Sequence, residues 1–216
     1  EKVKEAVAAA FMSLAESVDL EEQGCYVSPS ITSEDEALKT ACETMNKYVG
    51  ARITYQFGDK SETLSGDEIH NWLTVNGTSV RINEGKATEY VKKLAASYDT
   101  AYKAKSLKTS YGKTVSITGG SYGYKTNQAK EAATLVSLIK NGEQTSREPE
   151  YSQKAASHSG NDYGNTYVEI NLTAQHLYFY ANGKLLVESD FVSGNAAKGW
   201  STPAGAYSIT YKQRNA

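Results

Sequence analysis

Cysteine and histidine are the residue types in this sequence with the greatest chemical potential. A cysteine thiolate can attack a carbonyl group when a nearby histidine accepts its proton. The cysteines are Cys25 and Cys42, and the histidines are His70, His158 and His176. No histidine is near a cysteine in sequence, and no serine–histidine–aspartate spacing is present. We therefore assign no catalytic residue within these 216 positions.

The two cysteines allow two structural interpretations. A disulfide between Cys25 and Cys42 would close a modest loop. In an oxidising compartment such a bridge contributes roughly 3 kcal/mol. The alternative is two buried free thiols. Cys42 shares the apolar face of an expected helix with Leu38, Met45 and Val49, so both interpretations bury it.

Acidic residues do not form a recognisable metal site. Asp59, Glu62, Asp67 and Glu68 lie in two short polar stretches without the loop spacing of a calcium site. We interpret them as solvated turn residues. The sequence accordingly predicts neither a metal ion nor an organic cofactor.

Composition limits the classes of function. The 23 basic and 25 acidic residues nearly balance, and no basic stripe indicates nucleic-acid binding. No apolar run reaches the roughly 18 residues that suggest a membrane span, and no signal peptide is present. An anchor could lie upstream. Tyrosine is frequent (16) and phenylalanine scarce (4), which is typical of surface proteins. These features favour a location outside the cytoplasm.

Helical and strand-like segments alternate in the first two thirds of the chain. Ser33 and Glu36 form a capping box that is expected to begin one helix, and Gly50 ends it. Gly142 is expected to end a later helix. The pattern predicts an α+β domain in which helices pack on antiparallel hairpins. The expected helices cover residues 1–18, 33–49, 83–99 and 127–141, and the expected hairpins turn at 58–59 and 111–112.

The composition changes near residue 148. Residues 148–165 are polar and lack periodicity, which predicts an interdomain linker. Residues 166–216 alternate apolar and polar side chains, and Asn182-Gly183 favours a type I′ hairpin turn. The predicted fold class is α+β: a helix-and-hairpin module (29–147) followed by an incomplete all-β domain (166–216). Residues 1–28 are interpreted as the end of a preceding module.

Five ordered motifs give the β-rich part a family resemblance. They are Gln175–Leu177, Tyr178–Tyr180, Asn182-Gly183, Val192–Gly194 and Thr202–Gly205. Together they resemble the start of the L,D-transpeptidase (YkuD-type) catalytic domain. Residues of about 30 to 150 resemble the peptidoglycan-binding module that often precedes this domain in Gram-positive bacteria. That second resemblance is carried by the hairpin–helix order and by the phrases "ITYQFGD" and "YGKTVSITGGSYGYKT".

The resemblance implies a chemistry for which this chain lacks the residues. Enzymes of this family use a cysteine nucleophile in a Ser-His-Gly-Cys stretch, form an acyl-enzyme with a donor stem peptide and transfer it to an acceptor amine. That stretch is absent and would be expected beyond Ala216. His176 is interpreted as a solvated strand histidine. The chain is therefore expected to be an inactive fragment of a cell-wall cross-linking enzyme. The alternative is a non-catalytic peptidoglycan-binding or spacer module.

Aromatic residues are the candidate contacts to peptidoglycan. Tyr111, Tyr122 and Tyr124 could present a platform for sugars or stem peptides, or could be ordinary cross-strand pairs of a hairpin. Trp200 could form a groove wall or a plug over the end of a barrel. If the chain is a fragment, the strands within 166–211 lack closing partners, which predicts unpaired edges and a half-built core.

Overall fold

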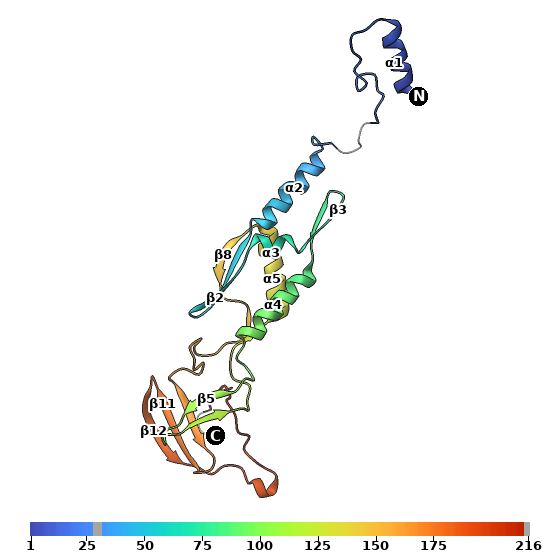
Figure 1. Ribbon diagram of the computed structural model, residues 1–216. Helices are drawn as coiled ribbons and strands as arrows, with labels where there is room; N and C mark the ends of the chain where they lie inside the picture. The colour runs from blue at the N-terminus through green and yellow to red at the C-terminus, as the bar shows by residue number, and fades with distance from the viewer. Residues whose placement is uncertain (28–31, 214–216) are drawn as a thin grey trace. The chain divides into compact units, whose positions relative to one another are not determined.

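The computed structural model describes residues 1–27 and 32–213. The predicted boundary at residues 28 and 29 lies outside this part, as do residues 214–216. The chain divides into two compact units, residues 1–43 and 44–216, each described by itself. The fold is α+β, with helices and several small sheets (Figure 1).

The first unit contains one complete helix. Helix α1 (Lys2–Met12) is shorter than the predicted 1–18, and none of its residues is buried. Leu14 follows in a left-handed conformation with φ of 57°, which interrupts the helix. The apolar residues Val3, Val7 and Phe11 are exposed. Periodicity located the helix correctly, but none of the described residues of this unit buries its apolar face.

Helix α2 (Glu36–Val49) begins in the first unit and ends in the second. The carboxylate of Asp35 accepts hydrogen bonds from the backbone N–H groups of Ala37 (2.9 Å) and Leu38 (3.0 Å). Asp35 therefore caps the helix, and the predicted capping box of Ser33 is wrong. Asp35 competes with Ser33 because both are good caps and the sequence does not rank them.

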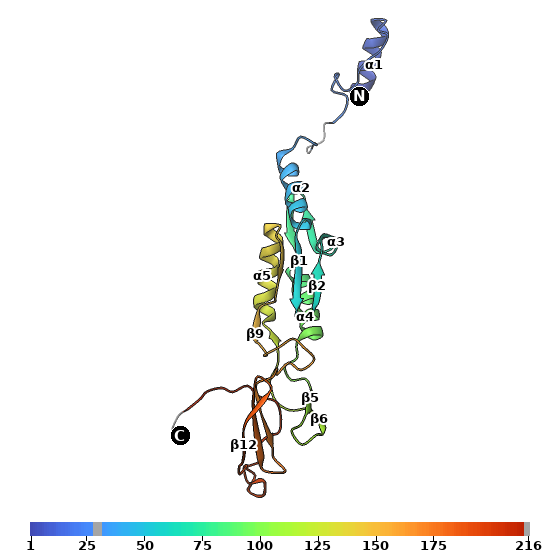
Figure 2. The same ribbon diagram turned by 90° about the vertical axis from the view of Figure 1, so that its left-hand side faces the viewer.

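The core of the second unit lies between a three-stranded sheet and two helices. Strand β1 (Arg52–Phe57) pairs antiparallel with β2 (Lys60–Leu64) and parallel with β8 (Gln144–Arg147). Helices α4 (Glu84–Tyr98) and α5 (Gln128–Asn141) pack together on one side of this sheet (Figures 1 and 2). Alternation along β1 buries Ile53, Tyr55 and Phe57 against them. The hairpin at 58–59 is confirmed, whereas the parallel partner β8 was not predicted.

Local caps set the ends of α4 and α5. The Asn83 side chain accepts hydrogen bonds at the start of α4, and that of Asn127 accepts from Lys130 N (3.2 Å) at the start of α5. Gly142 ends α5 with φ of 69°, a left-handed conformation that favours glycine, as predicted. A short helix α3 (Gly66–His70) and the hairpin of β3 (Leu73–Asn76) and β4 (Ser79–Ile82) complete this part.

A buried carboxylate connects α5 to the sheet. Glu131 is fully buried. Its Oε1 accepts hydrogen bonds from Tyr55 Oη (2.6 Å) and Arg147 Nη1 (2.6 Å), and its Oε2 accepts from Glu150 N (2.6 Å). Burial beside Glu131 raises the pKa of Tyr55 far above its usual value. Glu131 can therefore lie on the buried face of α5, because its charge is neutralised there.

The remaining β structure connects the two sequence regions. The hairpin of β5 (Lys105–Lys108) and β6 (Thr114–Ile117) turns at residues 109–113, and β7 (Lys125–Thr126) pairs with β9 (Tyr151–Gln153). The predicted linker 148–165 therefore contains a strand, and its Asp162 is buried. This segment is part of the fold, because polar residues can be buried when they find hydrogen-bonding partners.

The second sheet has the strand order β10–β11–β12. Its strands are β10 (Tyr167–Asn171), β11 (His176–Ala181) and β12 (Lys184–Asp190). Asn182 and Gly183 have φ of 50° and 77°, as a type I′ turn requires. Every residue of the edge strand β12 is exposed, which agrees with the predicted half-built core. The expected strand near residues 205–213 is wrong: among the described residues only Ala206 forms a bridge there, to Gly120.

Candidate functional site

The cysteines do not form a reactive pair. Both Cys25 and Cys42 are free thiols, Cys25 half-buried and Cys42 exposed. The disulfide is absent, and burial of Cys42 is also wrong. The neighbouring Ala41 is buried instead, with 4% of its surface exposed. Leu38, Met45 and Val49, which share the predicted face, are partly buried, so Cys42 is the exception on that face.

Tyr124 does not present a surface to a ligand. Only 7% of it is exposed, and burial raises its pKa. Its ring stacks on His158 with the ring centroids 3.8 Å apart, and Tyr151 lies 5.0 Å away. The Cβ atom of His158 also lies where a side chain on Gly58 would be. Tyr124 and His158 therefore belong to a small buried aromatic cluster beside the first sheet.

Tyr122 and Tyr111 occupy different environments. The Tyr122 hydroxyl donates to the carbonyl of Asp162 (3.2 Å) and accepts from Ala156 N (2.9 Å), and burial raises its pKa. Tyr111 is exposed at the turn of the β5–β6 hairpin. The three tyrosines thus do not form one platform, and Tyr111 alone among them is exposed.

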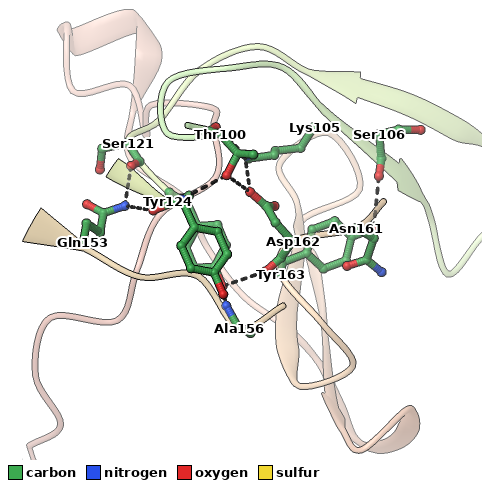
Figure 3. Close-up of polar contacts among 12 residues, drawn as sticks. Thr100, Lys105, Ser106, Ser121, Tyr124, Gln153, Ala156, Asn161, Asp162 and Tyr163 are labelled. Carbon is green, nitrogen blue, oxygen red and sulfur yellow. Dashed lines mark hydrogen bonds and ion pairs between the residues drawn. The ribbon is translucent and has the colours of Figure 1, made fainter. Parts of the chain in front are cut away.

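A buried ion pair lies at the base of the β5–β6 hairpin (Figure 3). Lys105 Nζ is 2.6 Å from Asp162 Oδ2 and donates to the carbonyl of Thr100 (2.6 Å). The Thr100 hydroxyl also donates to Asp162 Oδ2 (2.5 Å). The side chains of Lys105 and Asp162 are 7% and 6% exposed. The sequence pattern did not indicate this pair, because Lys105 lies in an expected hairpin and Asp162 in an expected linker.

The turn of the same hairpin contacts the second sheet. Glu169 on β10 is 5% exposed. Its Oε2 accepts hydrogen bonds from Ser110 N (2.9 Å) and Ser110 Oγ (2.7 Å), and Ser110 Oγ is 2.8 Å from the Tyr180 hydroxyl on β11. The sequence pattern predicts the opposite orientation, because period-two alternation would place Val168 and Ile170 inward and Glu169 outward, whereas Val168 and Ile170 are 43% and 53% exposed.

Trp200 lies in a compact loop that includes the 3₁₀ helix η1 (Ala196–Lys198). Asn195 accepts hydrogen bonds from Trp200 N (3.0 Å) and Lys198 N, which closes the loop. Trp200 is 68% exposed, and Lys198 Nζ lies 5.7 Å from its ring centroid. Within the described residues Trp200 therefore does not act as a plug, and its ring is accessible.

His176 is held between two carboxylates. Its Nδ1 is 2.7 Å from Asp190 Oδ1 and its Nε2 is 3.6 Å from Glu188 Oε2. The hydrogen bond to Asp190 is the main cause that raises the pKa of His176, and Glu188 adds to it. About a quarter of the side chain is exposed (26%). Both ring nitrogens of His176 therefore face carboxylates of β12.

The described residues lack two features that bear on metal binding and on membranes. They hold no group of three histidine, cysteine, aspartate or glutamate side chains arranged to bind a metal ion. Nor does this part of the chain include a helix of the length and apolarity needed to cross a membrane.

Two family models match the chain. The model described as "Putative peptidoglycan binding domain" matches residues 31–147, which is more than half of the sequence. The chain therefore belongs to this family. The model of the L,D-transpeptidase catalytic domain, named YkuD, matches residues 165–216. Glu169, Tyr180 and Trp200 lie in this second match, whereas Lys105, Ser110 and Tyr111 lie in the first.

Solved structures of L,D-transpeptidases also resemble this chain. One is the avibactam carbamoyl enzyme of Ldtfm, with 27% identity and a TM-score of 0.58, covering 78% of this chain and 65% of that one. Another is a cysteine-to-serine mutant of the Enterococcus faecium L,D-transpeptidase, with 27% identity and a TM-score of 0.57, covering 76% and 65%. The chain thus spans 65% of the length of these structures. A search of curated proteins found no match.

Proposed function

We propose that this chain is part of a cell-wall L,D-transpeptidase that cross-links peptidoglycan stem peptides. The order of its two family matches carries the proposal: a peptidoglycan-binding domain is followed directly by the start of an L,D-transpeptidase domain. The likeness to two L,D-transpeptidases over about three quarters of the chain supports it. A Gram-positive cell wall outside the cytoplasm is the location that fits this substrate.

The proposed reaction is acyl transfer through a cysteine. The thiolate attacks the carbonyl before the terminal D-residue of a donor stem, the D-residue leaves as an amine, and a thioester remains. An acceptor amine then attacks the thioester, forms the cross-linking amide and releases the thiolate. Cys25 and Cys42 lie in the first unit, outside the YkuD match. In this proposal the present chain binds the wall and supports the catalytic domain, and it is inactive alone.

Two exposed aromatic residues are the proposed contacts to the wall. Tyr111 and Trp200 are 47% and 68% exposed, and Lys198 beside Trp200 adds a positive charge for a carboxylate of the substrate. An aromatic side chain offers an apolar face with little conformational freedom to lose on binding. Tyr122 and Tyr124 are not among the proposed contacts, because Tyr122 is partly buried and Tyr124 is buried.

Sedimentation with purified peptidoglycan tests the binding part. The wild-type chain is expected to sediment with the sacculi, and Tyr111→Ala and Trp200→Ala are expected to reduce the bound fraction severalfold. Tyr102→Ala is the matched control, because Tyr102 is equally accessible (64% exposed) and belongs to neither contact. Failure of the wild-type chain to sediment would contradict wall binding, and equal loss in all three variants would contradict the named contacts.

A product assay tests the catalytic part. The present chain, incubated with a disaccharide tetrapeptide, is expected to release no D-residue, whereas the natural gene product is expected to release it and to gain a dimeric product. Mass spectrometry measures both. A second candidate is a non-catalytic wall-binding or spacer module, and the family match over residues 31–147 supports it as well. Inactivity of the natural gene product, with peptidoglycan binding retained, would support that candidate.

A further inference from the structure

Residues 105–122 belong to the peptidoglycan-binding match, yet they contact the L,D-transpeptidase match and the segment before it at three places. We propose that these residues, here called the clasp, are a structural part of the transpeptidase domain. The clasp consists of the β5–β6 hairpin and the extended segment that follows it. This inference concerns how the two matched domains are held together, and it does not depend on the proposed function.

The first contact is made by the turn of the clasp. Burial of an ionised carboxylate is costly unless hydrogen bonds compensate it. Glu169 on β10 is buried, and the hydrogen bonds that it accepts come from the backbone N–H and the hydroxyl of Ser110. Hydrogen bonds to a charged acceptor are roughly twice as strong as neutral ones. If the clasp were removed, Glu169 on β10 would lose both hydrogen-bond donors of Ser110.

The second contact lies at the base of the clasp (Figure 3). Lys105 forms its buried ion pair with Asp162, which precedes β10. The hydroxyl of the next residue, Tyr163, donates to the carbonyl of Ser106 (3.1 Å). Removal of one partner of a buried ion pair strongly destabilises a fold, because the other charge remains buried and uncompensated. This contact therefore fixes the position of Asp162 and Tyr163, which lead into β10.

The third contact is a backbone pairing of residues 119–122 with Ala206. Ala206 N donates to the carbonyl of Gly119 (2.9 Å), and Tyr122 N donates to the carbonyl of Ala206 (3.0 Å). A Cβ atom on Gly120 would lie 2.0 Å from the Ala206 oxygen, and one on Gly119 would lie 2.3 Å from the Ala204 oxygen. The close approach therefore requires glycine, and the pairing holds the turn that ends at Gly205.

The three contacts act on a sheet that has little support of its own. A small isolated sheet is marginally stable unless a packed face supports it. Every residue of β12 is exposed, whereas Glu169 on β10 is buried beneath the clasp. The binding domain thus supplies part of the framework of the transpeptidase domain, and the boundary between the two sequence families does not coincide with a boundary between independently stable parts.

Gly120→Ala and Gly77→Ala form a matched test of the clasp. Both glycines have left-handed φ values, 94° and 58°, but Gly77 lies outside the clasp, in the β3–β4 hairpin, and a Cβ there would meet no atom within 4 Å. Amide hydrogen exchange is measured on the whole 216-residue chain. Gly120→Ala is expected to accelerate exchange at residues 167–171 and 206 at least tenfold while β1 stays protected, and Gly77→Ala is expected to leave exchange in both regions unchanged. Equal exchange in the two variants would overturn the proposal.

A double-mutant cycle provides a second test that does not depend on the glycines. Ser110→Ala and Glu169→Gln are made singly and together, and the unfolding equilibrium constant is measured in urea. When two residues contact each other, the effect of the double substitution on this constant differs from the product of the two single effects. When they are independent, the two single effects multiply. We expect the double variant to differ from the product of the single effects by about fivefold or more. A purely multiplicative result would overturn the contact. Neither test measures peptidoglycan binding, so failure of the clasp and failure of the proposed function are distinguishable.

Discussion

Strands β1 and β12 each contain three apolar or aromatic residues suited to burial, but their environments are opposite. Ile53, Tyr55 and Phe57 on β1 are at most 3% exposed, because α4 and α5 cover that face. Leu186 and Val187 on β12 are 59% and 52% exposed. Apolar residues on a strand favour its burial, but a second layer of helices or strands must pack on that face to bury it. The first sheet therefore has a complete core, and the second sheet depends on the clasp.

Truncation of a core leucine tests the comparison most strongly. Leu135 on α5 is fully buried, and Leu135→Ala is expected to lower the free energy of unfolding by about 3–5 kcal/mol through lost contacts and a cavity. Leu186→Ala on β12 is expected to change it by less than about 0.5 kcal/mol. Urea unfolding followed by circular dichroism measures both. Comparable losses in the two variants would mean that β12 is buried in solution.

Removal of the counter-ion of Glu131 tests the polar part of the first core. Arg147→Met leaves the fully buried carboxylate without its guanidinium partner, so we expect a loss of about 3 kcal/mol. Arg81→Met, on the exposed side of β4, is the control and is expected to change stability by less than about 0.5 kcal/mol. Thermal unfolding of both variants provides the measurement. A neutral Arg147→Met would show that Tyr55 and Glu150 N suffice for Glu131.

Two asparagine caps with the same hydrogen-bond length allow a finer comparison of the two regions. Asn127 Oδ1 accepts from Lys130 N at 3.2 Å at the start of α5, and Asn195 Oδ1 accepts from Lys198 N at 3.2 Å at the start of η1. Asn127→Ala is expected to cost about 1 kcal/mol, because it uncaps a packed helix. Asn195→Ala is expected to cost less than half of that. Urea midpoints measure the difference, and a reversed order would contradict the comparison.

The smallest expected effect is the pH dependence of the stability of the second sheet. Asp190, with Glu188, raises the pKa of His176 in the folded state above its usual value near 6.5. The protonated imidazole therefore stabilises the sheet fully below about pH 6.5, and this contribution is lost as the pH rises through the raised pKa. NMR titration of the imidazole measures the pKa directly. His176→Gln is expected to remove this part of the pH dependence, and an imidazole that titrates at or below 6.5 would refute it.

Local signals predicted much of the backbone. Gly58-Asp59 and Asn182-Gly183 turn their hairpins as expected, and Gly142 ends α5 in a left-handed conformation. These features depend on a few adjacent residues, so a short window of sequence contains their cause. Where two local signals competed, as for Ser33 and Asp35, the sequence could not choose between them.

The candidate site was less predictable. Tyr111 and Trp200 are accessible, but Tyr124 is buried and the cysteines are unpaired. Burial of Tyr124 depends on His158, which comes from a segment that looked like a linker. The partners of Lys105 and Glu169 likewise lie more than fifty residues away, and sequence periodicity carries no information on such pairs.

The amino-acid sequence by itself determined the α+β class, the positions of most helices and turns, and the resemblance to a peptidoglycan-binding domain followed by a YkuD domain. Only the tertiary structure decided the parallel pairing of β8 with β1, the burial of Glu131 and the joining of Gly120 to Ala206. A bulge between Phe179 and Tyr180 also shifted the register, so that Asp190 lies opposite His176. Turns and caps arise from neighbouring residues, whereas pairing and burial depend on which distant residues the folded chain brings together.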